Sequence, residues 1–329
     1  MNAFEYVTAE GYELAAAQLA KSKPGETLVK AGGIDVLDRL KERIDTPKSV
    51  LNMRVAPVRP AGIAVRESES VLAIDALTTM AQVAENADVQ KRFPALARAC
   101  NDAATPQVRN AATIGGNLCQ KPRCWYFRSE DFHCLKKGGS TCYAVEGDNR
   151  YHAILGAGAC HIVHPSNAAV ALLALGASVR VVRNEGGAAK ERTIGLDKFF
   201  RVPANPLDDE NILEFGELIR EVTIPLSSAG PRSAYLEVRE KVSFDWPLVS
   251  CAVNLNDRNN PRVVMGAVAP IPWRMLKIEE LLIGKELGDE LTATIRSAAA
   301  VGAKPMTHNA YKVQLVGVIV ERALREANK

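Results

Sequence analysis

The first fifty residues alternate between apolar runs typical of strands and amphipathic stretches typical of helices. Residues 10–21 have the apolar spacing of a helix, 27–31 form a short apolar strand, and 34–43 again have helical spacing. The pair Gly32-Gly33 separates this strand from the second helix. A strand–turn–helix order of this kind predicts an α/β or α+β domain at the start of the chain.

The same two periods recur along most of the remaining chain. Strands are expected at 50–53, 62–65, 71–74, 178–182, 217–225, 234–238, 249–255 and 263–268. Helices are expected at 168–175, about 276–283, 289–302 and 309–327, with a helix start at 75–79 and a helical zone at 76–104 broken at Pro94. Ser, Gly and Pro cluster at 226–231, which predicts a domain boundary there.

One long segment, from Leu118 to about Arg150, has neither period. Loops beyond roughly 12–15 residues are uncommon in compact domains unless something holds them. Five of the seven cysteines lie between residues 119 and 160. An odd number of cysteines in a chain without a visible signal peptide argues against a secreted disulfide framework. The segment is therefore expected to be ordered by a metal centre.

The spacing of the thiols leaves the kind of centre open. Thiolates are the usual ligands of iron–sulfur clusters, and four of them satisfy one cluster. Zinc uses the same ligands but typically with close cysteine pairs, which this segment lacks. Two disulfides or inert thiols are further alternatives. Cys100 and Cys251 lie among apolar residues and are expected in the core.

Composition excludes several classes of protein. Apolar residues make up 47% and charged residues 24%, the balance of a soluble globular chain rather than a disordered or fibrous one. The formal charge of +3 is too small to indicate a nucleic-acid partner. The longest apolar stretch, 168–179, is too short to cross a bilayer. Acidic residues and the lack of Lys and Arg in the first fourteen positions speak against a signal peptide, so synthesis in the cytoplasm is expected.

Two glycine-containing motifs are candidate ligand sites. In Lys30–Asp35 (KAGGID), glycines would let the backbone approach a ligand, and the N–H groups that start the next helix would suit a pyrophosphate. Arg109–Asn117 could offer backbone N–H groups and side-chain hydrogen bonds to a phosphate or a polar ring edge. Each is also compatible with a glycine turn that binds nothing. His152, His161 and His164 are read as hydrogen-bonded or solvated side chains rather than ligands.

Three motifs, in their order along the chain, resemble the FAD-binding subunit of molybdenum hydroxylases: KAGGID at 30–35, ATIGGNL at 112–118 and HPSN at 164–167. The resemblance implies an α+β protein. It would have a PCMH-type FAD-binding domain of two α/β subdomains at 1–226, with a cysteine-rich insertion at about 118–163. A C-terminal α+β domain of the CO dehydrogenase flavoprotein type, with an antiparallel sheet and helices, would cover 227–329.

The insertion resembles the [4Fe–4S]-carrying flavin subunits of 4-hydroxybenzoyl-CoA reductase and, most closely, of bacterial periplasmic aldehyde oxidoreductase. This likeness implies a [4Fe–4S] cluster held by Cys124, Cys134, Cys142 and Cys160, with Cys119 as an extra thiol. It also implies that FAD is bound by Leu28, Val29, Lys30, Ala31, Gly32, Gly33, Ile34, Asp35, Val36, Thr113, Ile114, Gly115, Gly116, Asn117, Asn167 and Ile219. Backbone N–H groups of both glycine segments would contact the pyrophosphate, and no residue of this chain is expected to be catalytic.

Three positions depart from the usual family pattern. Ile34 stands where Thr is usual, Asn167 where Asp is usual, and Glu237 where many relatives have Lys. No role is carried over to Glu237.

The implied function is that of an oxidoreductase subunit that transfers electrons. A large subunit with the molybdenum cofactor would oxidise an aldehyde, a small subunit would carry [2Fe–2S] clusters, and FAD here would pass electrons to an external acceptor. The resemblance leaves open a flavin subunit of a 4-hydroxybenzoyl-CoA reductase-like or xanthine dehydrogenase-like complex. A non-redox binding module with a structural zinc site is the alternative from another class. Assembly is expected in the cytoplasm, and export to the periplasm with a signal-bearing partner is compatible with the sequence.

Overall fold

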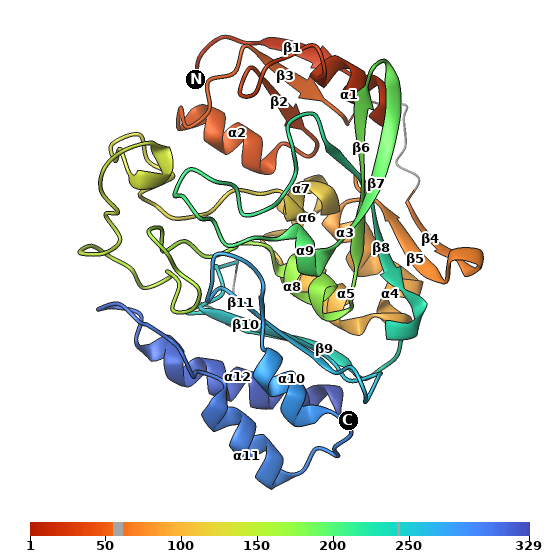
Figure 1. Ribbon diagram of the computed structural model, residues 1–329, viewed down its shortest axis with the longest axis vertical. Helices are drawn as coiled ribbons and strands as arrows, with labels where there is room; N and C mark the ends of the chain where they lie inside the picture. The colour runs from red at the N-terminus through yellow and green to blue at the C-terminus, as the bar shows by residue number, and fades with distance from the viewer. Residues whose placement is uncertain (55–61, 242–243) are drawn as a thin grey trace.

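The computed structural model describes residues 1–54, 62–241 and 244–329. Three layers follow one another along the longest axis of the molecule (Figure 1). A small N-terminal sheet is followed by a central sheet with most of the helices, and a C-terminal sheet with three helices lies at the other end. None of the helices in these ranges has the length and apolar character that crossing a bilayer requires.

The N-terminal layer is a parallel sheet with the strand order β1-β3-β2. Its elements are β1 (Glu5–Thr8), α1 (Tyr12–Leu19), β2 (Thr27–Lys30), α2 (Ile34–Lys41) and β3 (Ser49–Asn52). Parallel neighbours need a crossover connection, which α2 provides between β2 and β3. The predicted strand–glycine turn–helix is therefore confirmed.

The central layer is an antiparallel sheet of five strands with helices around it. The strands, in spatial order, are β4 (Ile63–Arg66), β5 (Val71–Asp75), β8 (Leu218–Pro225), β6 (Ser178–Glu185) and β7 (Ala188–Gly195). The helices are α3 (Met80–Glu85), α4 (Ala87–Arg92), α5 (Pro94–Asp102), α6 (Pro106–Ala111), α7 (Ile114–Leu118), α8 (Asn167–Ala174) and α9 (Leu196–Phe199), with short 3₁₀ turns at Glu67–Glu69 and Leu226–Ser228. All eight residues of α8 are buried, as its continuous apolar sequence requires.

The C-terminal layer is an antiparallel sheet with helices packed on it. Its elements are β9 (Ser233–Val238), β10 (Val249–Asn254), β11 (Arg262–Gly266), β12 (Trp273–Arg274), α10 (Leu276–Leu282), α11 (Asp289–Ala298) and α12 (Tyr311–Ala327). Both faces of β10 are buried: Cys251 and Val253 join the core beneath the three helices, whereas Ala252 joins the central core that contains α8. The two cores thus share one strand, and the predicted α+β fold is confirmed.

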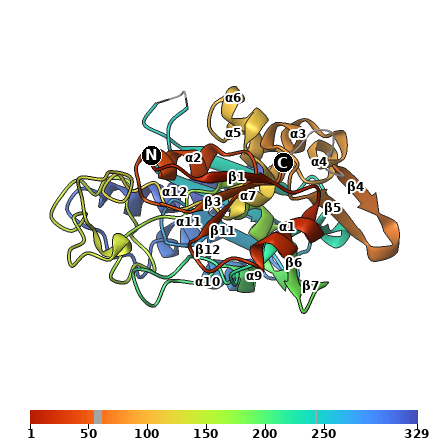
Figure 2. The ribbon, with the colours of Figure 1, turned by 90° about the horizontal axis from the view of Figure 1, so that it is seen from above.

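The cysteine-rich insertion is almost free of regular structure, as its sequence predicts. Between α7 and α8 it contains one 3₁₀ turn, η2 (Leu135–Lys137), and an isolated bridge from Cys134 to Thr141. It forms loops along one side of the molecule (Figure 2). Aromatic rings order part of it: the Tyr126 ring lies 5.1 Å from Phe132 and 6.1 Å from Tyr143, centroid to centroid.

Some elements differ from the prediction. The segment 109–117, for which no helix was predicted, contains the end of α6 and the start of α7. The predicted helix start at 75–79 contains instead the last residue of β5 and a turn. The helix α3 begins only after Thr79, its N-cap, whose hydroxyl accepts from the backbone N–H of Gln82. Strands β1 and β7 were not predicted. In β7 most side chains are exposed, and the sequence lacks the alternation of apolar and polar residues that indicates a strand.

Candidate functional site

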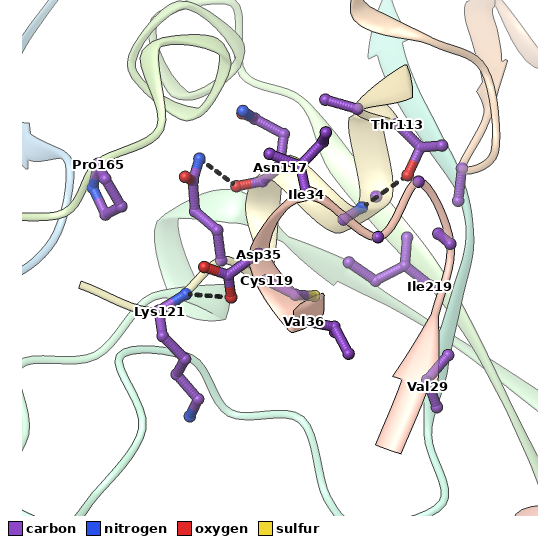
Figure 3. A pocket seen from close by; sticks show the side chains of 18 of the residues that line it. Val29, Ile34, Asp35, Val36, Thr113, Asn117, Cys119, Lys121, Pro165 and Ile219 are labelled. Atoms are coloured by element: carbon purple, nitrogen blue, oxygen red, sulfur yellow. Dashed lines mark hydrogen bonds between the residues drawn. The ribbon is translucent and has the colours of Figure 1, made fainter. Parts of the chain in front are cut away.

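A cavity of about 700 Å³ lies where the β2–α2 turn, α7, β8 and residues 244–247 meet (Figure 3). Thirteen of the sixteen predicted FAD-binding residues line it: Val29, Ala31, Gly32, Gly33, Ile34, Asp35, Val36, Thr113, Gly115, Gly116, Asn117, Asn167 and Ile219. The fold thus brings together segments that are up to 190 residues apart in the sequence.

The other three predicted residues, Leu28, Lys30 and Ile114, do not line the cavity. Side chains alternate across a strand, so Val29 faces the cavity and its neighbours in β2 face away. The Lys30 ammonium donates instead to the Asn52 side chain, at 3.0 Å. The side chain of Ile114, the first residue of α7, is fully buried in the central core.

The β2–α2 turn presents a row of unused N–H groups at the cavity. Gly33 has a φ of 83°, in the left-handed region that favours glycine, and α2 begins directly after it. The backbone N–H groups of residues 32–36 donate to no acceptor within the described ranges. Free N–H groups at the start of a helix attract anions, so this turn is suited to a phosphate.

The second glycine segment uses its N–H groups within the protein. The N–H of Gly115 donates to the Ala76 carbonyl at 2.9 Å, and that of Gly116 donates to the Thr113 hydroxyl at 3.2 Å. The N–H of Asn117 donates to the Thr113 carbonyl at 2.8 Å. These N–H groups cap and form α7, and the predicted contact of this segment with a pyrophosphate stays a prediction. Its glycines serve close packing, because a Cβ on Gly115 would lie 2.8 Å from the Cβ of Ala76.

The end of the cavity near α2 is rich in charge. The Asp35 carboxylate is bound by Arg128 at 2.6 Å and Arg123 at 3.0 Å, with Arg39 at 3.7 Å. Burial alone would raise the pKa of Asp35, but these arginines outweigh burial and hold its pKa below the ordinary value. Figure 3 shows Asp35 beside Lys121, whose backbone N–H donates to the same carboxylate at 3.2 Å.

Several residues of this cavity were not predicted from the sequence. Arg39, Lys121, Arg123 and Trp246 all line it. The Arg123 Nε is buried without a hydrogen-bond partner among the described residues. Its guanidinium lies 5.5 Å from the centre of the Trp246 ring. The sequence places Arg123 next to Cys124, yet nothing local reveals a contact with a helix some ninety residues earlier.

Glu237, to which sequence analysis assigned no role, is buried behind Asn167. The Asn167 amide donates to the Glu237 carboxylate at 3.0 Å, and the Tyr235 hydroxyl donates to the same oxygen at 2.9 Å. Arg239 forms an ion pair with the other carboxylate oxygen. Glu237 thereby orients Asn167 at the cavity wall, and its charge is compensated.

The four predicted ligand cysteines line a second, small cavity inside the insertion, which has room for about one water molecule. Cys124, Cys134, Cys142 and Cys160 contribute to its wall, together with His152 and His161. Cys119 lines the large cavity instead. No three His, Cys, Asp or Glu side chains in the described part of the chain are arranged to hold a single metal ion. All seven cysteines are free thiols.

His152 lies against one of these thiols, with Nε2 at 3.2 Å from the Cys124 sulfur. Burial lowers the pKa of His152 to about 4, so the ring is neutral near pH 7 and carries one proton. Its Nδ1 is buried with no partner among the described residues. The hydrogen bond between Nε2 and the Cys124 thiol can run in either direction, and the tautomer of the ring sets which atom donates. Burial also raises the pKa of Cys124 to about 12 and that of Cys160 to about 11.

Comparison with known families identifies the class of protein to which the chain belongs. Residues 2–227 match the family described as the FAD-binding domain in molybdopterin dehydrogenase. Residues 233–327 match the CO dehydrogenase flavoprotein C-terminal domain. The chain belongs to the FAD-binding subunits of molybdenum hydroxylases. Members of this family are oxidoreductase subunits, so the alternative of a non-redox binding module is wrong.

Individual relatives cover nearly the whole chain. The aldehyde oxidoreductase FAD-binding subunit PaoB of Escherichia coli is 33% identical, over 95% of this chain and 94% of its own. The carbon monoxide dehydrogenase medium chain of Hydrogenophaga pseudoflava is 26% identical, over 98% and 96%. A solved structure of carbon monoxide dehydrogenase from Hydrogenophaga pseudoflava superimposes with a TM-score of 0.71 at 25% identity, over 99% of this chain and 97% of that one.

The large cavity fits the cofactor of the family. Unused N–H groups, an arginine with a free buried Nε and mostly apolar walls are what an anionic dinucleotide with an aromatic ring system requires.

Proposed function

We propose that this chain is the electron-transfer subunit of a heterotrimeric molybdenum-cofactor aldehyde oxidoreductase, and that it holds both FAD and a [4Fe–4S] cluster. The observation that carries the proposal is that all four predicted ligand cysteines line one cavity in an insertion that also forms a wall of the large cavity. The 33% identity to an aldehyde oxidoreductase subunit supports the choice of substrate class.

FAD, when bound, supplies one- and two-electron redox chemistry, and the chain supplies its binding and orientation. The N–H groups of residues 32–36 are the donors for the pyrophosphate. Val29 and Ile219 provide apolar walls of the same cavity. Asn167, held by Glu237, offers a fixed amide to a polar edge of the cofactor. No substrate carbon reacts on these residues.

The choice of a cluster over a single zinc ion rests on the resemblance of the insertion to [4Fe–4S]-carrying subunits, not on the geometry of the thiols. In a tetrahedral zinc site each sulfur lies about 2.3 Å from one metal, so the four sulfurs converge on one point. The four thiols surround a cavity without forming such a group within the described residues. A cluster spreads its ligands over several iron atoms and supplies one-electron chemistry. The cavity has room for about one water molecule, so the thiols would have to move apart and lose their protons to hold a cluster. A proton on His152 Nε2 would then be donated to the Cys124 thiolate.

The remaining parts of the proposal concern the complex. The partners are a large subunit with the molybdenum cofactor and a small subunit with [2Fe–2S] clusters, and electrons leave through FAD to an external acceptor. A 4-hydroxybenzoyl-CoA reductase-like complex would use the same chain in the opposite direction, and the partner's substrate pocket distinguishes the two. The complex is assembled in the cytoplasm, and a signal on a partner would direct it to the periplasm. The domain boundary is near residue 226, and the insertion covers about 118–163.

The cluster is tested by a pair of cysteine variants. Cys134→Ser is expected to lose its iron while keeping much of its FAD, because it removes one ligand of the cluster but none of the walls of the large cavity. Cys119→Ser is the matched control and is expected to keep its iron, since Cys119 lines the other cavity. Iron and FAD are measured on the purified chains. Full iron content in Cys134→Ser, or equal loss in both variants, would refute the ligand assignment.

A further inference from the structure

We infer that two arginines of the cysteine-rich insertion, Arg123 and Arg128, are positioning residues of the FAD site. They neutralise Asp35 at the start of α2 and thereby allow a pyrophosphate to occupy the turn before that helix. The inference rests on the proposed placement of the pyrophosphate at residues 32–36. It gives the insertion a role in flavin binding that is separate from its thiols.

Asp35 stands in an unfavourable place for binding an anion. It is the second residue of α2, and its carboxylate lines the cavity beside the unused N–H groups of the turn. A carboxylate at a helix start is attracted by the same partial charges that attract a phosphate. Its side chain is only 14% exposed, so water screens its charge weakly. Without a counter-charge, Asp35 would repel a pyrophosphate.

The counter-charge comes from the insertion rather than from α2. Arg128 binds Asp35 at 2.6 Å and Asp38 at 2.8 Å, and so bridges two successive turns of the helix. Arg123 binds Asp35 at 3.0 Å. Arg39, the cation of α2 that reaches Asp35, lies farther away at 3.7 Å and also binds Asp45 at 2.8 Å. The two insertion arginines therefore provide most of the compensation.

Their positions are set by the fold of the insertion. The Arg128 guanidinium donates to the carbonyls of Pro122 at 2.7 Å and Lys121 at 2.9 Å, and its side chain is 10% exposed. Arg123 immediately precedes Cys124, so one residue faces the large cavity and the next faces the cysteine cavity. The buried, unpartnered Nε of Arg123 is a free donor at the same place among the described residues.

The inference predicts a specific dependence between charges. Arg128→Gln in the full chain should weaken FAD binding by at least about tenfold, because it leaves the Asp35 charge undercompensated. In the Asp35→Asn background, Arg128→Gln should lower the affinity for FAD by less than about threefold, because residue 35 then carries no charge to neutralise. Arg128→Lys, which keeps the charge, should recover part of the affinity.

The dissociation constant is measured by adding FAD back to the chain after its removal, with riboflavin as a second probe. Riboflavin lacks the phosphates, so its weaker binding should change less than that of FAD in Arg128→Gln. Circular dichroism checks that each variant is folded. If Arg128→Gln costs the same FAD affinity in the wild-type and Asp35→Asn backgrounds, or costs none in either, the inference is overturned while FAD binding itself stands. A wild-type chain that binds no FAD would instead overturn the proposed function.

Discussion

Gly32 illustrates how single residues of the cavity are constrained by packing before any ligand is considered. A Cβ at this position would lie 2.0 Å from the carbonyl oxygen of Ala111, which belongs to the end of α6. The close approach of the two backbones fixes the position of the β2–α2 turn against α6 and α7. Glycine is therefore required at residue 32 by the fold itself, and its absence of a side chain also keeps the N–H groups accessible.

Gly32→Ala is accordingly expected to destabilise the chain by about 2 kcal/mol or more and to reduce its FAD content. The added methyl must push the turn away from Ala111, which displaces the start of α2. Gly158→Ala is the control, since a Cβ there meets nothing within 4 Å. Thermal unfolding and the FAD released from purified protein are measured for both. Equal stability and FAD content in the two variants would show that the turn tolerates a side chain.

At the scale of elements, the insertion is attached to both ends of the molecule. Arg128 binds α2 of the N-terminal layer, as described above. The Lys312 ammonium, in the first turn of α12, donates to the carbonyls of His152 at 3.1 Å and Ala267 at 2.8 Å. The Asn309 amide also donates to the His152 carbonyl, at 3.2 Å. The C-terminal layer thus fixes the backbone that carries His152 next to Cys124.

The burial of Lys312 predicts a pH dependence of stability. Burial lowers its pKa to about 7 in the folded chain, against roughly 10.4 in the unfolded chain. Between these values the unfolded chain binds a proton that the folded chain does not, so this residue adds stability as the pH rises. The loss of folding free energy caused by burying the protonated Lys312 is complete below pH 7 and disappears above the pKa of the unfolded chain.

The measurement compares free energies of unfolding across pH. The stability of wild type minus that of Lys312→Met should rise by about 1 kcal/mol per pH unit between roughly pH 7.5 and 9.5. Lys304→Met is the matched control, because the Lys304 side chain is exposed and the difference should stay flat. A flat difference for Lys312→Met as well would contradict the burial of an uncharged lysine there.

The sequence predicts those elements in which the periodicity of apolar residues lies within the element itself. The β2–α2 unit, α8 and the strands β9, β10 and β11 follow from their periodicity, whereas the two-residue strand β12 was not predicted. Helix α7 could not be predicted in this way: it contains Gly115 and Gly116, which are poor helix formers, and depends on the Thr113 cap and the Ala76 carbonyl. The Asp35–Arg128 pair was equally hidden, because no local pattern links residues so distant in the chain.

At the scale of the whole molecule, two cavities lie on either side of one strip of the insertion. The large cavity joins the N-terminal and central layers, and the cysteine cavity lies between η2 and the segment that α12 holds. The two cavities are adjacent at Arg123 and Cys124, since Arg123 lines the large cavity and Cys124 lines the cysteine cavity. With FAD in the first cavity and the proposed cluster in the second, the chain would be suited to electron transfer, and the chemistry of the substrate would belong to a partner.

The content of flavin, iron and acid-labile sulfide in the purified full-length chain, made with ample riboflavin and iron, tests this account most directly. The account predicts one FAD and about four iron and four sulfide per chain, with a flavin band above a broad iron–sulfur absorption. A chain that carries flavin but a single zinc ion in place of iron, or one that carries neither group, would contradict it.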